Sequence, residues 1–214
     1  MLTLYDYYRS SAAYRVRIAL NLKKCSYDKV EVHLLKDGGQ QHTASYKQIN
    51  PLSLVPTLQD GDTTITESLA IIEYLDEKFP KPSLLPSNII DKALVRAFAL
   101  TIVADTHPLC NLRVNNYLAE QFHITEAQKK QWIQHWITVG LTALESQLST
   151  QQSNGKFCFG DAPTLADVCL IPQLYSAKRF ECDLTPFKTL TTIGEHCNQL
   201  SAFADAYPVE PVTS

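Results

Sequence analysis

The chain has 214 residues, of which 45% are hydrophobic, and a formal net charge of −3. This length suits one large domain or two small ones, and the near-balanced charge excludes the basic excess typical of nucleic-acid-binding proteins. The longest apolar stretches are too short to span a membrane. Residues 1–6 show no basic region followed by an apolar one, so we expect no secretory signal and a cytoplasmic protein.

The cysteines are scattered along the chain and form neither a C-x-x-C pair nor a zinc-binding spacing. In a cytoplasmic protein the expected state of such residues is a reduced thiol, packed as a small apolar group. We therefore expect no metal site. The six positions are Cys25, Cys110, Cys158, Cys169, Cys182 and Cys197.

The first 80 residues have the pattern of an α/β unit. Apolar residues recur at helical spacing in two segments and at strand spacing in others, and an Asp60-Gly61 turn between two short runs is typical of a β-hairpin. The order β-α-β-(α)-β-β-α predicts a sheet with a parallel and an antiparallel part. The predicted strands are at 2–5, 27–34, 55–58 and 63–65, and the two clearest helices are at 11–23 and 66–79.

Residues 81–88 are rich in proline and follow a complete α/β unit, so we interpret them as a linker. The chain after them has a helical pattern throughout. Residues 91–104 are almost wholly apolar, as in a buried helix, and Thr164 and Asp167 have the spacing of a capping box. We therefore predict an α/β domain over 1–80, a linker over 81–88 and an all-helical domain over 89–214.

Arg9, Ser10 and Ser11 lie where the first predicted strand turns into the first helix. Backbone N–H groups at a helix start favour an anion, and a serine hydroxyl there can donate a hydrogen bond to a thiolate. The alternative is that the serines only cap the helix. The spacing alone leaves both interpretations open.

Two further segments of the α/β unit are candidates for binding. Val55 precedes a proline at the start of a strand, where a cis peptide would expose its backbone to a ligand; a plain loop proline is the alternative. Glu67 and Ser68 open the next helix and offer a second anion site, or else they supply ordinary capping and first-turn charge.

Polar and ionisable groups also interrupt the helical half of the chain, at His107 and at Asn111 to Arg113. A histidine beside a proline is usually structural. Arg179 lies near the end of the helix that begins at the capping box, where it can serve the helix dipole or bind a carboxylate. No metal cluster, Ser/His/Asp order, phosphate loop or nucleotide fingerprint is present.

Taken together, several motifs resemble the glutathione transferase superfamily, and within it the zeta class, which includes maleylacetoacetate isomerases. Their order and spacing cover nearly the whole chain. The motifs are Arg9-Ser10-Ser11, Tyr14 to Leu20, Lys36 to Gln41, Asn50-Pro51, Val55 to Leu58, Ser68 to Leu75, Asn111-Leu112-Arg113, Arg179-Phe180 and Asp183 to Pro186.

The resemblance implies an α/β thioredoxin-like N-terminal domain, an all-α C-terminal domain, glutathione as cosubstrate and a homodimer. It implies that Ser10 stabilises the glutathione thiolate with support from Ser11, that Val55 pairs with the glutathione backbone, and that Glu67 and Ser68 face its γ-glutamyl group. The implied glutathione-binding positions are Ser10, Ser11, Ala12, Ala13, Tyr14, Arg15, Gln41, Val55, Glu67, Ser68, His107, Asn111, Leu112 and Arg113.

The implied reaction is the cis–trans isomerisation of maleylacetoacetate to fumarylacetoacetate in tyrosine and phenylalanine breakdown, by reversible addition of the glutathione thiolate. A dicarboxylate substrate needs cationic partners, and arginine binds carboxylates through two parallel hydrogen bonds. Arg9, Arg113 and Arg179 are the candidates, and Arg9 is adjacent to Ser10. Arg15 and Arg17 lie inside the helix and are expected to serve structure.

The chain departs from the class pattern at Ala12, where a cysteine is usual, and at Tyr14, where many members carry tryptophan. Three alternatives therefore stay open. These are a maleylpyruvate isomerase, a general glutathione S-transferase acting on haloacids or other electrophiles, and a glutathione-binding or partner-binding module without turnover. The loop from Lys36 to Gln41 favours the maleylacetoacetate type, whereas the arginines suit either isomerase.

Overall fold

The computed structural model describes residues 1–150 and 155–210. The chain divides into two compact units. The first consists of Met1–Ser83 together with the chain from Leu200 onward, and the second of Leu84–Gln199.

The first unit is built on a four-stranded sheet in the order β2-β1-β3-β4. β1 pairs in parallel with β2 and antiparallel with β3, and β3 forms a hairpin with β4 around Gly61. The mixed sheet and the hairpin agree with the sequence prediction. The strands are β1 (Leu2–Asp6), β2 (Tyr27–Glu31), β3 (Thr57–Asp60) and β4 (Thr63–Thr66).

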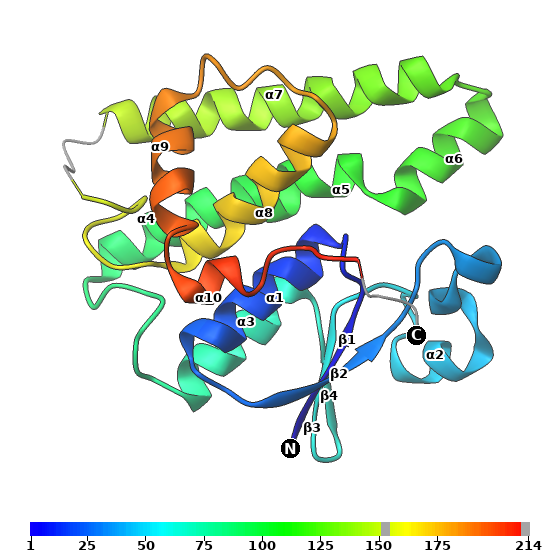
Figure 1. Cartoon of the computed structure of the whole chain (residues 1–214), viewed down its shortest axis with the longest axis horizontal. Coiled ribbons are helices and arrows are strands. Elements are labelled where there is room, and N and C mark those ends of the chain that lie inside the picture. Colours follow the sequence, from blue (N-terminus) through cyan, green and yellow to red (C-terminus); the bar gives the residue numbers. More distant parts are fainter. Residues whose placement is uncertain (151–154, 211–214) are drawn as a thin grey trace. The chain divides into compact units, whose positions relative to one another are not determined.

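Helices cover both faces of this sheet (Figure 1). On one face α1 (Ser11–Leu22) and α3 (Ser68–Lys78) pack against each other and bury an aliphatic core. On the other lies α2 (Ala44–Ile49), after two short turns of 3-10 helix, η1 (Lys36–Gly38) and η2 (Gln40–His42). The cluster on the α2 side consists of Tyr7, Tyr8, Val32, Tyr46 and Val55.

A buried lysine closes the end of α3. The side chain of Lys23 has no exposed surface, and its ammonium donates to Asp76 Oδ1 at 2.5 Å, to the Phe79 carbonyl at 2.8 Å and to the Pro82 carbonyl. Since the last carbonyls of a helix lack intrahelical partners, this charge satisfies the helix end and fixes the chain that leaves it.

The C-terminal segment, Leu200 to Glu210, belongs to the first unit and not to the helical domain in which the sequence analysis places it. It contains α10 (Ser201–Ala204). Asn21 donates to the Ala202 carbonyl at 3.0 Å and Arg17 to the Ala206 carbonyl at 3.1 Å. Hydrogen bonds from α1 therefore determine where this segment lies.

The second unit is helical around the largely buried α8. Asp167 Oδ2 accepts hydrogen bonds from the amide and the hydroxyl of Thr164, as the capping-box spacing predicts. Leu84, within the predicted linker, is buried in this unit and its carbonyl accepts from Leu165 N. The elements are α4 (Ile89–Leu100), the π-helical η3 (Thr101–Thr106), α5 (His107–Cys110), α6 (Leu112–Phe122), α7 (Glu126–Thr150), α8 (Leu165–Arg179) and α9 (Lys188–Cys197).

The π-helical turn η3 has a local cause in the sequence. Pro108 lacks an N–H and its ring would clash with the carbonyl four residues earlier in a regular helix, and a wider turn relieves that conflict. Thr106 Oγ1 donates to the Thr101 carbonyl at 2.8 Å. A Cβ on Gly140 of α7 would lie 2.2 Å from Thr106 Oγ1, so only glycine allows this approach.

Helix α4 is less buried than the apolar run over 91–104 predicts. Val95 and Phe98 face the core, but Ile90, Leu94 and Leu100 are exposed. One apolar face of α4 is thus open within the unit. None of the helices in the described part of the chain combines the length and apolar character needed to cross a membrane.

Candidate active site

Ser10 is the N-cap of α1. Its amide donates to the Tyr7 carbonyl at 2.8 Å, and its Oγ accepts from Ala13 N at 3.2 Å. Capping uses an oxygen lone pair and leaves the hydroxyl hydrogen available. The same serine can therefore cap the helix and donate to a thiolate, so the two interpretations of the sequence are compatible. Ser11 is the first residue of the helix and is half-buried.

The following residues of α1 turn inward. Ala13, Tyr14 and Arg15 have almost no exposed surface, whereas Ala12 is half-buried. Side chains buried in this way serve the packing of α1, and a ligand at the helix start would meet the backbone of this first turn. Amides of a first helical turn lack intrahelical partners and carry partial positive charge.

Arg9 precedes the cap and is partly exposed. Its guanidinium lies 5.0 Å from the centre of the Tyr8 ring and 3.7 Å from Glu210 Oε2. Burial, followed by the neighbouring Glu210 carboxylate, raises the pKa of Tyr8 to about 12.

Gln41 is held by the loop that precedes it. Gly39 has φ 95°, and a Cβ there would lie 2.5 Å from Gln41 Nε2, so glycine is needed both for the backbone and for the contact. Gln41 Nε2 donates to the Leu34 carbonyl at 3.3 Å. Its Oε1 is buried and accepts no hydrogen bond from the residues that the structure describes. A buried acceptor of this kind calls for a donor.

Val55 lies just before β3, and the Val55-Pro56 peptide is cis, which is one of the two possibilities that the sequence left open. The preceding loop is fixed by buried polar groups. Tyr46 Oη donates to the Leu54 carbonyl at 2.7 Å, and Asn50 Nδ2 donates to it at 2.8 Å. Because Val55 lies outside the strand, its backbone groups are not committed to the pairing of β3 with its neighbours.

At the start of α3, Glu67 has φ 67° and ψ 118°, an uncommon conformation for a residue other than glycine. Such strain concentrates at functional sites. The Glu67 side chain is exposed, and Ser68 is buried. Arg15 Nη1 donates to Ser68 Oγ at 3.2 Å, so a buried guanidinium adds positive charge beside this helix start.

Contacts within the first unit bring these segments together. Tyr8, next to Arg9 and Ser10, packs with Val55 in one hydrophobic cluster, and the carbonyl of Leu34, which packs against this cluster, accepts from Gln41. Arg15 joins the starts of α1 and α3. The result is two helix N-termini, free loop backbone and a buried amide acceptor, a set suited to a small peptide with carboxylates and a thiol.

Comparison with known proteins identifies the family. Residues 4–83 match the N-terminal domain of glutathione S-transferases, and residues 140–186 match their C-terminal domain. The chain is 46% identical to a probable maleylacetoacetate isomerase of Vibrio cholerae, over 97% of this chain and 95% of that protein. The chain belongs to the glutathione S-transferase family.

Solved structures of this family agree closely with the chain. A bacterial zeta-class maleylpyruvate isomerase in its holo form is 41% identical, covers 96% of both chains and has a TM-score of 0.94. A maleylacetoacetate isomerase of Methylobacterium extorquens with bound malonate and glutathione is 39% identical, with the same coverage and a TM-score of 0.93. The thioredoxin-like first unit and helical second unit are those of a zeta-class glutathione S-transferase.

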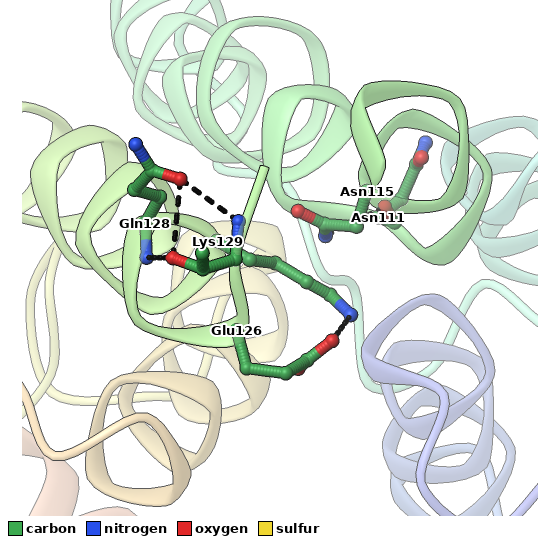
Figure 2. A network of polar contacts seen from close by, with 6 residues as sticks. Asn111, Asn115, Glu126, Gln128 and Lys129 are labelled. Carbon is green, nitrogen blue, oxygen red and sulfur yellow. Dashed lines mark hydrogen bonds and ion pairs between the residues drawn. The ribbon is translucent and has the colours of Figure 1, made fainter. Parts of the chain in front are cut away.

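The remaining candidates lie in the second unit of this glutathione S-transferase. His107 begins α5, and Asn111 caps α6 by accepting from Val114 N at 3.0 Å. Asn115 Nδ2 donates to the Asn111 carbonyl at 2.8 Å, and both asparagines are drawn in Figure 2. Leu112 is half-buried, whereas Arg113 is exposed on α6.

Two hydrogen-bonded pairs order the start of α7. Lys129 donates to Glu126 at 2.8 Å, and the Thr125 amide donates to Gln128 Oε1 at the same distance (Figure 2). Arg179 ends α8, is exposed, and stacks 4.8 Å from the centre of the Phe180 ring. The second unit therefore presents two exposed guanidinium groups from the predicted set.

Five of the six cysteines of this family member have environments that disfavour the thiolate. All six are free of disulfide bonds. Burial raises the pKa of five thiols, that of Cys110 to about 12. These groups therefore stay protonated at neutral pH, and the protonated thiol is not nucleophilic. The four other cysteines with raised pKa values are Cys25, Cys158, Cys182 and Cys197.

Sequence reasoning missed several residues that shape the site. Asn50 and Tyr46 fix the loop before Val55, because both side chains donate to the Leu54 carbonyl. Glu210 approaches Arg9 from a distant part of the sequence, and Arg17, nine positions from Tyr8, donates to the Tyr8 carbonyl. The polarity of Arg17 within an apolar helix and the Asn50-Pro51 motif were visible in advance, but these contacts were not.

Proposed function

We propose that this protein catalyses the glutathione-dependent cis–trans isomerisation of maleylacetoacetate to fumarylacetoacetate, in the breakdown of tyrosine and phenylalanine. The observation that carries the proposal is the geometry of Ser10. Its oxygen accepts from Ala13 N, which orients the hydroxyl at the start of α1 while its hydrogen remains free to donate. The relatives named as maleylacetoacetate isomerases supply the substrate class.

The residues of the first unit fit glutathione. Gln41 offers a buried oxygen without a described donor, and Val55 offers backbone groups outside the sheet. Ser68 lies at a helix start made more positive by the Arg15 guanidinium, and it would bind the γ-glutamyl carboxylate of glutathione. Glu67 provides a carboxylate for the amino group of the same γ-glutamyl residue. When bound, glutathione supplies a thiolate that adds to the cis alkene, allows rotation about the former double bond, and leaves again.

Ser10 and the start of α1 hold that sulfur ionised. A cysteine thiol has an ordinary pKa of about 8.5, and a decrease of about 2 units requires about 2.7 kcal/mol. A hydrogen bond to a charged group contributes about 1.5–3 kcal/mol, and a helix N-terminus about 0.3–1 kcal/mol. Together these contributions are sufficient without a separate base.

Arginines of this chain bind the carboxylates of the substrate and stabilise the enolate that develops on addition. Arg9 is our first candidate because it directly precedes Ser10. Arg113 and Arg179 are further candidates on the second unit, where both are exposed. A guanidinium can bind a carboxylate through two parallel hydrogen bonds.

We also propose that the protein is a cytoplasmic homodimer. The exposed apolar face of α4 supports this, since Ile89 is 79% and Ile90 65% exposed, and contiguous apolar surface is usually covered by a partner. Sedimentation velocity at several protein concentrations tests it. A monomer at micromolar concentration would contradict the proposal.

Maleylpyruvate is the second candidate substrate, because the holo maleylpyruvate isomerase has the same fold at 41% identity. Like maleylacetoacetate, maleylpyruvate carries a cis double bond beside a carbonyl group and a carboxylate.

The deciding experiment follows maleylacetoacetate consumption, coupled to fumarylacetoacetate hydrolase, with and without glutathione. Maleylpyruvate is assayed in parallel. Glutathione-dependent loss of maleylacetoacetate, with the higher kcat/KM of the two substrates, is the expected result. No turnover of either substrate by a protein that still binds glutathione would refute the proposal and favour a general transferase or a binding module.

A further inference from the structure

One buried guanidinium fixes both the loop before Ser10 and the C-terminal segment. Arg17 Nη1 contacts Asp6 Oδ1 at 2.6 Å, Nη2 donates to the Tyr8 carbonyl at 3.1 Å, and Nε donates to the Ala206 carbonyl at 3.1 Å. Both segments are therefore positioned by the same rigid fork of donors.

The segment continues from this anchor to Glu210. Pro208 is buried, so the chain is held between Ala206 and Glu210. The Glu210 carboxylate then reaches the loop before Ser10, where its Oε2 lies 3.7 Å from Arg9 Nη2.

The hold of Glu210 on Arg9 is weak enough to be displaced. The two side chains are 69% and 39% exposed, and at this separation the pair is an exposed ion pair of modest strength. A substrate carboxylate that binds the guanidinium through two hydrogen bonds has the better geometry. Yet Glu210 remains tethered beside Arg9, so it competes at a high local concentration.

We propose that Glu210 is a specificity-determining residue of this enzyme, which competes with the substrate carboxylate for Arg9 and so weakens the binding of dianionic ligands. The inference rests on the proposed role of Arg9 in binding dicarboxylates. It follows that neutralising Glu210 strengthens dicarboxylate binding and lowers KM, while kcat and the use of an uncharged electrophile stay the same.

The test is calorimetric titration of malonate into protein saturated with S-methylglutathione, which cannot form a thiolate. Malonate is a suitable probe because a relative binds it together with glutathione. The Glu210→Gln variant is compared with the wild type and with Asp205→Asn, which removes an exposed charge from the same segment. We expect Glu210→Gln to bind malonate about two- to fivefold more tightly, with a gain that shrinks as salt increases, and Asp205→Asn to match the wild type.

Kinetics provide a readout that a merely structural role would not give. With Glu210→Gln, KM for the cis-dicarboxylate should fall while kcat, and kcat/KM for a neutral chloronitrobenzene, stay unchanged. Equal malonate binding by wild type and Glu210→Gln would overturn this inference but not the proposed dicarboxylate function. An equal gain in Asp205→Asn would also overturn it, because general charge would then explain the effect. Absence of malonate binding in all three proteins would overturn both the inference and the dicarboxylate function.

Discussion

Replacing Ser10 by glycine and by alanine separates its capping role from its role toward the thiolate. The Ser10 oxygen accepts from Ala13 N at 3.2 Å. At an N-cap, alanine costs about 0.5–2 kcal/mol of stability, whereas glycine costs only a few tenths of a kcal/mol. Both variants lose the hydroxyl hydrogen completely. Stability should therefore distinguish the two variants, and thiolate chemistry should not.

The magnitude follows from the hydrogen bond to the sulfur. Loss of about 1.5–3 kcal/mol raises the pKa of bound glutathione by about 1–2 units and lowers kcat/KM at neutral pH about 10- to 100-fold. The pKa is measured from the ultraviolet absorbance of the thiolate during a pH titration of the glutathione complex. Glutathione affinity and the thermal unfolding midpoint are recorded on the same samples.

A capping control comes from the second unit. Asn88 caps α4 by accepting from Ile90 N at 2.8 Å and Asp91 N at 3.2 Å, so Asn88→Gly alters a helix cap without touching the first unit. It should leave the pKa of bound glutathione unchanged. The reasoning fails if both Ser10 variants retain the wild-type thiol pKa, or if activity is lost in the alanine variant but not in the glycine variant.

Three further predictions concern the scaffold of the first unit. Lys23→Met removes a buried ammonium from an acid and two carbonyls, so the free energy of unfolding in urea should fall by about 3 kcal/mol; an unchanged midpoint would contradict this. Gly39→Ala places a methyl group against Gln41, which should weaken glutathione binding several-fold by calorimetry, whereas unaltered affinity would show that the loop adapts. Hydrogen bonds from Lys78 and Tyr74 lower the pKa of Asp60 from 3.8; the stability they add is present above pH 3.8 and lost as pH falls further. The difference in unfolding midpoint between wild type and Asp60→Asn should therefore vanish in acid, and a constant difference would refute the assignment.

Much of the first unit could be predicted because its signals are local. Alternating apolar residues predicted β1, and the turn at Gly61 predicted the hairpin of β3 and β4. Ser10 at the start of a helix was identified as both a cap and a candidate for chemistry. Each of these features depends on residues close together in the chain.

Features that depend on distant contacts could not be predicted. Arg17 is separated from Ala206 by 189 positions, and nothing in the sequence near either residue indicates the other. The apolar run over 91–104 suggested a buried helix, but a run of this kind does not distinguish burial in the core from an exposed face, as Leu94 and Leu100 illustrate.

Pro108 shows an intermediate case. A proline cannot donate a backbone hydrogen bond, so a departure from regular helical geometry beside Pro108 has a cause in the sequence. The sequence did not show that the chain would absorb the break in a π-helical turn, since that depends on Thr106 and on the close approach of Gly140 in α7.

The attachment of residues 200–210 to α1 gives the first unit a discontinuous sequence. During synthesis these residues leave the ribosome after the whole of the second unit. Until then the Nε donor of Arg17 lacks the Ala206 carbonyl, and the core of the first unit lacks the buried side chain of Phe203. The first unit is thus completed only after the second, and a fragment that ends at Ser83 would leave a buried donor without its acceptor.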